Sequence, residues 1–198
     1  FATLRRETRV RILVGVIVVA GLVNGIADVL FVTFTDDRLD GGGGQAGLLA
    51  ASYGVGGLLG AITVARIIRN RNVIRAFLTS AVLAGGALVA MAATEGLGMA
   101  LVLFAVLGAG ETFLRLAASV TIQRQSPTDV LARVFGIVEG AQVAAIAIGA
   151  LLVTILVSRF TVSESFVVLG FVVLGLVGIL VVRLRASGDG PPPVDPVI

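Results

Sequence analysis

The chain has 198 residues, of which 57% are hydrophobic and only 14% are charged, and its mean hydropathy is +1.07. A soluble domain carries roughly 25% charged residues to cover its surface, so this composition predicts that the chain dissolves in lipid. Cys, His and Lys are all absent. Their absence excludes thiolate and imidazole metal sites, Cys nucleophiles, Ser-His triads and lysine Schiff bases, and we expect neither a cofactor nor an enzyme.

Six apolar runs are each about long enough to cross a bilayer, because a hydrocarbon core of roughly 30 Å needs about 20 helical residues. The runs are continuous rather than alternating, so they predict helices and not a transmembrane barrel. The expected fold is all-α, a polytopic membrane protein with a six-transmembrane-helix bundle. The spans are expected at about residues 11–33, 46–65, 74–94, 97–119, 134–157 and 164–183.

The segments outside the spans are short. A lead-in at 1–10 precedes the bundle at 11–185, and a Pro- and Gly-rich linker follows at 186–198. The connections are an acidic, glycine-rich turn at 34–45, a basic loop at 66–73, a tight turn at 95–96, the longest polar connection at 120–133 and a turn at 158–163. The chain begins with Phe1 and shows no signal-peptide pattern, so we expect a piece of a longer protein.

The arginines predict the orientation of the bundle. Twelve of them lie on the side of the two termini, Arg38 and Arg159 lie on the other side, and Arg115 falls inside a span. Cytoplasmic loops hold the excess of basic residues, so we expect a multi-pass protein of the inner (plasma) membrane with both termini cytoplasmic. This distribution also explains the isoelectric point of about 10.9 without any nucleic acid as a partner.

Small residues recur four positions apart inside the spans, a spacing that lets helix backbones approach closely in lipid. The pairs are Gly21 and Gly25, Gly56 and Gly60, Gly136 and Gly140, and Ala145 and Gly149. Two interpretations stay open. The pairs are packing seams within one bundle, or they are seams along which helices slide or bend during a transport cycle.

Polar side chains are unevenly distributed among the spans. A charge at a helix centre costs roughly 2.5–3.5 kcal/mol on insertion, so such residues rarely face lipid. We therefore expect spans one, two, four and five to surround a polar interior, with spans three and six outside against lipid. The candidates for a substrate or proton pathway are Glu111, Asn24, Asp28, Tyr53 and Gln142, although Asp28 also fits an interfacial residue.

Glu111 and Arg115 are four residues apart and can pair on one helix face. With Glu139 and Arg66, and with Arg133 before the fifth span, they are candidates for a gate charge network near the inner mouth of the bundle. Three interpretations stay open. The pair fixes helix register, the network breaks and reforms between states, or these groups bind substrate or protons directly.

These features resemble one half of a major facilitator superfamily transporter of the drug-exporter-like branch. Residues 60–71 (GAITVARIIRNR) are similar to the family's glycine-then-arginine loop motif between its eighth and ninth helices, without its acidic residue. Residues 123–136 (QRQSPTDVLARVFG) are similar to the loop before the eleventh helix, where the Pro and Arg of such exporters fall on Pro127 and Arg133. The resemblance covers about residues 5–185.

The resemblance implies the C-terminal half, helices seven to twelve, of a secondary active transporter whose two halves rock around a central site. Spans one and four would line the path, and the partners would be the bilayer, a missing N-terminal six-helix half and a small-molecule substrate. We expect a proton-coupled exporter that works by alternating access. Some relatives carry a cyclic-nucleotide-binding domain after the last helix, and the Pro-rich tail would suit that linker.

Two other hypotheses stay open. One is a six-helix membrane anchor or sensor for a cytoplasmic signalling domain, which predicts that Glu111 affects no flux. The other is a complete small exporter, against which the missing initial Met weighs.

Overall fold

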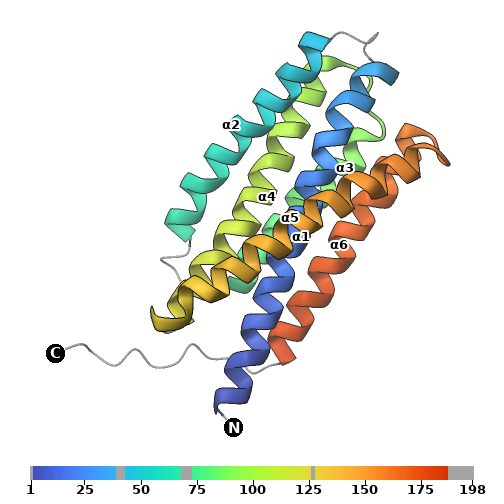
Figure 1. Ribbon diagram of the computed structural model, residues 1–198. Helices are drawn as coiled ribbons and strands as arrows, with labels where there is room; N and C mark the ends of the chain where they lie inside the picture. The colour runs from blue at the N-terminus through green and yellow to red at the C-terminus, as the bar shows by residue number, and fades with distance from the viewer. Residues whose placement is uncertain (1, 39–42, 68–72, 126–127, 187–198) are drawn as a thin grey trace.

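The computed structural model describes residues 2–38, 43–67, 73–125 and 128–186 (Figure 1), and side chains at 12–38, 44–63, 77–123, 135–183 and 186. Six helices lie within these ranges: α1 (Ala2–Arg38), α2 (Gly43–Ile67), α3 (Val73–Met91), α4 (Leu97–Gln125), α5 (Thr128–Val157) and α6 (Val162–Ala186). No strand occurs among the described residues, and the predicted all-α class is confirmed. The predictions for 39–42, 68–72, Pro127 and 187–198 lie outside the described residues.

Five of the six helices are long and apolar enough to cross a membrane, as judged over the described residues. Their most apolar windows have mean hydropathies between 1.5 and 2.9. α3 is shorter, with 19 residues in all and a described apolar part at Phe77–Met91. The chain is therefore a multi-pass membrane protein.

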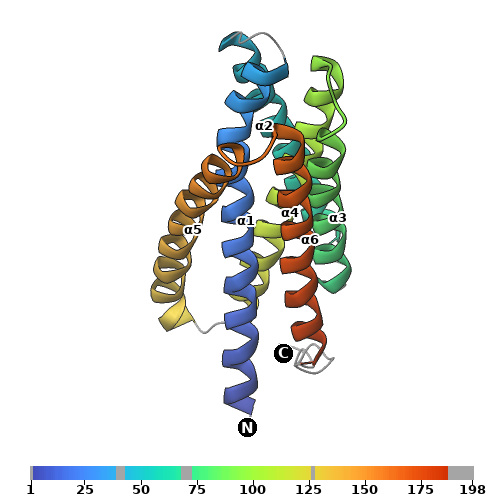
Figure 2. The ribbon, with the colours of Figure 1, turned by 90° about the vertical axis from the view of Figure 1, so that its right-hand side faces the viewer.

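α1 and α4 occupy the centre of the bundle. α2 packs mainly on α4, α5 packs mainly on α1, and α3 contacts both α4 and α6. Figure 2 shows α5 on one side of α1, with α6 and α3 on the other. Consecutive helices run in opposite directions (Figure 1). We call the end where α1 begins and α6 ends the terminal end, and the opposite one the far end.

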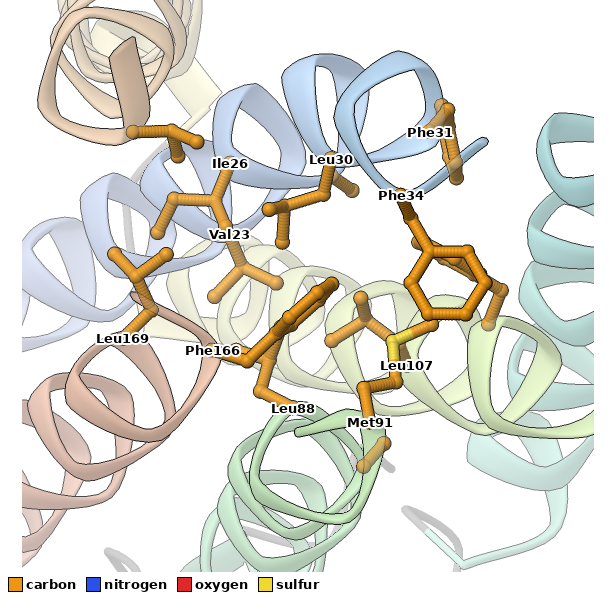
Figure 3. Close-up of a cluster of buried hydrophobic side chains, with 14 of the residues drawn as sticks. Val23, Ile26, Leu30, Phe31, Phe34, Leu88, Met91, Leu107, Phe166 and Leu169 are labelled. Carbon is orange, nitrogen blue, oxygen red and sulfur yellow. The ribbon is translucent and has the colours of Figure 1, made fainter. Parts of the chain in front are cut away.

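A cluster of aromatic and aliphatic side chains joins α1, α3, α4 and α6 toward the far end (Figure 3). Phe34, Phe104 and Phe166 are fully buried. The ring of Phe34 meets the other two edge-on, with centroids 6.3 Å from Phe104 and 6.0 Å from Phe166. Edge-to-face pairs at this distance are stabilising, so the cluster holds α1 against α4 and α6.

Glycines let two pairs of helices touch through their backbones. A Cβ at Gly25 would lie 2.0 Å from the carbonyl oxygen of Ile146, and one at Gly56 would lie 1.8 Å from that of Ala105. The first contact belongs to the α1–α5 seam and the second to the α2–α4 seam. Backbones this close leave no room for a side chain, which is why small residues recur there.

Three of the four predicted pairs of small residues take part in these seams. Gly21 and Gly25 face α5, Ala145 and Gly149 face α1, and Gly56 and Gly60 face α4. For the fourth pair, Gly136 and Gly140, the first of the two interpretations, a packing seam within this bundle, is wrong. Both residues are exposed, and a Cβ on either would meet nothing within 4 Å, because α5 turns its opposite face to α1.

α2 and α5 are the most exposed of the five long helices. Only 22% of the apolar window of α2 and 17% of that of α5 is buried, against 61% for α1. This differs from the expectation that spans three and six would be outermost. The reason is that α2 and α5 each have one main neighbour, whereas α3 and α6 pack against each other as well as against the centre.

Arg38, the last residue of α1, ties three helices together at the far end. Its guanidinium donates to the Thr94 carbonyl at 3.1 Å and to the Ser163 hydroxyl, and its Nε lies 3.0 Å from an Asp37 carboxylate oxygen. Thr94 follows the C-terminus of α3, where carbonyl groups lack helical partners. Arg38 therefore joins the end of α3 and the start of α6 to α1.

α6 begins with a capping box. The Thr161 backbone N–H donates to a carboxylate oxygen of Glu164 at 3.0 Å, and the Glu164 N–H donates to the Thr161 hydroxyl at 3.3 Å. This reciprocal pair satisfies two backbone donors that a helix start would otherwise leave open.

Candidate functional site

Glu111 lies in α4 on the side that faces α1 and α2. It is the one charged residue that is buried among the described side chains. Burying an ionisable group in a membrane span is costly unless hydrogen bonds or an opposite charge compensate it. The neighbours of Glu111 therefore define the site.

The first neighbours come from α4 itself. Nε of Arg115 lies 3.4 Å from one carboxylate oxygen of Glu111, and the Thr112 hydroxyl donates to the other at 3.2 Å. The two members of the ion pair differ in environment, because the Arg115 side chain is 40% exposed and that of Glu111 only 4%. The pair thus reaches from the interior of the bundle to its surface.

α2 brings Tyr53 against the same part of α4. Gly108 lets the backbones of α2 and α4 approach, since a Cβ there would lie 2.1 Å from the Tyr53 carbonyl oxygen. Glu111 follows Gly108 by three residues, so Tyr53 comes to the face of α4 that carries Glu111. The ring of Tyr53 also packs edge-on against Phe31 of α1, with centroids 5.6 Å apart.

α1 completes the cluster through Asn24, whose Nδ2 donates to the Tyr53 hydroxyl at 3.3 Å. We call Asn24, Tyr53, Thr112, Glu111 and Arg115 the polar cluster, a group from three helices that contains the Asn24–Tyr53 and Thr112–Glu111 hydrogen bonds and the Arg115–Glu111 ion pair. Four of these five residues were candidates from the sequence.

The remaining pathway candidates, Asp28 and Gln142, lie outside the polar cluster. Asp28 is exposed and stands one helical turn beyond Asn24 on the same face of α1. Gln142 of α5 is half-buried in the α1–α5 seam, where its Cγ would lie 3.1 Å from a Cβ at Gly21. The structure therefore brings Asn24, Tyr53 and Glu111 together, with Asp28 adjacent, and places Gln142 in a packing contact.

Of the candidate gate charge network, the described side chains form one ion pair, Arg115–Glu111. Among the described side chains the ion pairs are Arg38–Asp37 and Arg115–Glu111. Glu139 is exposed on α5 and takes part in neither pair. The side chains of Arg66 and Arg133 lie outside the described residues.

Sequence reasoning missed one member of the polar cluster, Thr112, and the helix-joining contacts of Arg38 at the far end. Thr112 carried a weak signal, since a hydroxyl next to a buried carboxylate can donate to it. The contacts of Arg38 carried none, because its partners lie 56 and 125 residues away along the chain.

The structure defines a helical membrane protein with a polar cluster enclosed between three of its spans. A model of the Major Facilitator Superfamily matches residues 13–196, which is nearly the whole chain. The chain therefore belongs to the Major Facilitator Superfamily, and its class of function is membrane transport. No curated protein and no solved structure matches it.

Proposed function

We propose that the chain is the C-terminal six-helix half of a proton-coupled secondary transporter of the drug-exporter-like branch. In this proposal it exports a small molecule by alternating access, and the substrate site lies between this half and an N-terminal half. The terminal end of the bundle faces the cytoplasm, following the excess of arginines at that end. Membership of the superfamily supports the transporter class.

The observation that carries the proposal is the burial of Glu111 within the polar cluster. A carboxyl group inside a membrane span is a functional group by default. Among the described side chains Glu111 has one cationic partner, Arg115, which is itself partly open to the surface. When Glu111 takes up a proton, the attraction between the two weakens and Arg115 is released, so protonation can change the local structure.

The exposed surfaces of α2 and α5 support the presence of a second half. Each helix presents two different exposed faces. One face holds mainly small residues at helical spacing, Gly47, Ala50 and Gly54 on α2 and Gly136, Gly140 and Ala147 on α5, with Leu58 and Val143 as the large residues among them. The other holds aliphatic residues, Val55, Leu59 and Ile62 on α2 and Ile148, Leu151 and Ile155 on α5. Small faces suit close helix packing and aliphatic faces suit lipid.

Glu139 belongs to this arrangement as a proposed member of the gate charge network, together with Arg115, Arg66 and Arg133. It is exposed and adjoins Gly136 and Gly140 on the small face of α5. A carboxylate facing lipid would be costly. We therefore place Glu139 at the contact with the N-terminal half, where a basic side chain compensates it in one of the two states.

The test uses the full-length protein in lipid vesicles that contain a pH-sensitive dye. A panel of small organic solutes is added, and proton movement across the vesicle membrane is recorded. We expect solute-dependent proton flux in the wild type and none in Glu111→Gln. The matched control is Glu95→Gln, because Glu95 is exposed in the turn between α3 and α4 and should keep the flux.

Wild-type flux in Glu111→Gln at every pH would remove Glu111 from the mechanism. A wild type that moves no protons with any solute would favour the alternative of a membrane anchor.

A further inference from the structure

We propose that Gly57 of α2 is a positioning residue for Glu111, because it leaves the space in which the Thr112 hydroxyl donates to the Glu111 carboxylate. The packing of α2 on α4 thereby sets the proton affinity of Glu111. This inference rests on the proposed function, in which Glu111 takes up and releases a proton.

The Thr112 hydroxyl has an unusual acceptor for a threonine inside a helix. Such a hydroxyl commonly donates to the carbonyl group four residues earlier, as those of Thr33 and Thr121 do at 3.0 and 2.6 Å. For Thr112 that carbonyl belongs to Gly108. Its one hydroxyl proton goes to a carboxylate oxygen of the adjacent Glu111 at 3.2 Å.

Gly57 faces this hydroxyl directly. A Cβ at Gly57 would lie 2.9 Å from Oγ1 of Thr112, a separation that real Cβ atoms essentially never show. The same Cβ would lie 3.8 Å from the Thr112 Cβ and 3.8 Å from the Gly108 carbonyl oxygen, which are ordinary contacts. Of these three atoms, only the hydroxyl oxygen that donates to Glu111 would have to move.

The backbone beside Gly57 leaves the threonine side chain as the part that yields. A Cβ at Gly56 would lie 1.8 Å from the Ala105 carbonyl oxygen, so α2 rests on the backbone of α4 at this point. A threonine side chain turns about a single bond between staggered positions, whereas two helices in backbone contact must separate as whole bodies. A methyl group at position 57 should therefore turn the Thr112 hydroxyl away from Glu111.

Loss of this hydrogen bond changes the balance between the two forms of Glu111. Nε of Arg115 lies 3.4 Å from one carboxylate oxygen, and Thr112 donates to the other. Both interactions favour the charged form. Without the Thr112 bond the charged form is less stable, so Glu111 should take up its proton at a higher pH.

The other groups that act on Glu111 are the same in every variant of this test. α4 packs mainly against α1, α2 and α3. Arg115 lies on α4 itself, Tyr53 is the one titratable side chain of the described part of α2, and Asp28 lies on α1. The described part of α3, 77–91, carries no charged residue.

The experiment records infrared spectra of the full-length protein in lipid as a function of pH. The signal is the carboxylic-acid band that Glu111→Gln removes, and the measured quantity is the pH at which half of it is present. We expect Gly57→Ala and Thr112→Ala each to raise this midpoint by about one pH unit, since each removes one hydrogen bond to a charged group.

The double variant shows whether Gly57 acts through Thr112. Without the hydroxyl, a methyl group at position 57 has no contact closer than 3.8 Å. Gly57→Ala combined with Thr112→Ala should therefore have the same midpoint as Thr112→Ala alone, instead of the sum of two shifts.

Two controls keep the local chemistry. Gly54→Ala makes the same change on α2, but a Cβ at Gly54 meets nothing within 4 Å, so the midpoint should equal that of the wild type. Thr112→Ser keeps a hydroxyl beside Glu111 and should also stay near the wild-type midpoint. A shift in Thr112→Ser as large as that in Thr112→Ala would overturn the role of the hydroxyl.

The remaining outcomes separate a positioning role from a purely structural one. An unchanged midpoint in Thr112→Ala or in Gly57→Ala overturns the inference, as do additive shifts in the double variant. If Gly57→Ala fails to fold and the double variant folds, the contact with Thr112 is supported. Failure of both to fold overturns it, because the methyl group then disturbs the backbone instead.

The proposed function fails in a different way. A carboxylic-acid band that survives Glu111→Gln overturns the proton site itself. Midpoints that shift as expected in a protein without solute-dependent proton flux support the positioning by Gly57 and contradict the transporter.

Discussion

The bundle contains two kinds of small-residue surface, and their surroundings differ completely. In the α1–α5 and α2–α4 seams, glycines bring backbones so close that a single added carbon would overlap a carbonyl group. On α5, Gly136 and Gly140 have the same spacing but meet nothing within 4 Å. Small-residue spacing therefore permits a close contact between helices. Whether that contact forms within one bundle depends on how the neighbouring helices pack.

The strongest test of this difference is one added methyl group in each environment. Gly25→Ala should destabilise the protein by about 3 kcal/mol, because α1 and α5 must separate to admit it and overpacking typically costs up to that amount. Gly140→Ala should cost nothing, since helix propensity favours Ala over Gly by about 1 kcal/mol. The free energy of unfolding of both variants in detergent measures the difference. Equal free energies would contradict the close backbone contact between α1 and α5.

A larger side chain on the open face should separate stability from transport. Gly140→Leu should leave the free energy of unfolding within about 0.5 kcal/mol, as exposed sites tolerate substitution. It should lower solute-dependent proton flux in the full-length protein about tenfold, because about 1.4 kcal/mol of overpacking against the other half suffices. Ile155→Leu on the aliphatic face is the control, and unchanged flux in Gly140→Leu would argue against a second half at this face.

The far end offers a contact between helices that relies on a side chain instead of glycine. Arg38→Gln should destabilise the protein by about 2 kcal/mol, since it loses charged hydrogen bonds to Thr94 and Ser163. Arg159 is exposed in the turn between α5 and α6, so Arg159→Gln should change little. Thermal unfolding of the two variants tests this prediction. If Arg38→Gln does not lower the unfolding temperature, the packing of α3 and α6 alone is sufficient to hold the far end together.

The smallest expected effect concerns the start of α6. Thr161→Ala removes the capping hydroxyl and should cost about 1 kcal/mol. Thr154→Ala is a suitable comparison, because that exposed hydroxyl bonds to the Ala150 carbonyl within its own helix at 2.9 Å. If both variants unfold at the same temperature, the capping box contributes nothing measurable.

The sequence predicts helices well and their contacts less well. Continuous apolar runs specify the six helices because lipid leaves few alternatives for the backbone, and the spacing of Glu111 and Arg115 specifies their pairing. The bond between Asn24 and Tyr53 joins residues 29 apart on different helices, so it depends on how α1 and α2 pack. The open position of Gly136 and Gly140 likewise depends on which face α5 turns to α1.

In the proposed transporter the polar cluster borders an aqueous path instead of lipid, and thiol labelling tests this placement most directly. The chain has no Cys, so single cysteines can be placed at Asp28, beside the cluster, and at Ile155, on the aliphatic face of α5. Both positions are exposed. In full-length protein in membranes, with any other cysteines replaced, we expect a water-soluble maleimide to label Asp28→Cys and to leave Ile155→Cys unlabelled. Equal labelling of both, or labelling of Ile155→Cys alone, would contradict the claim.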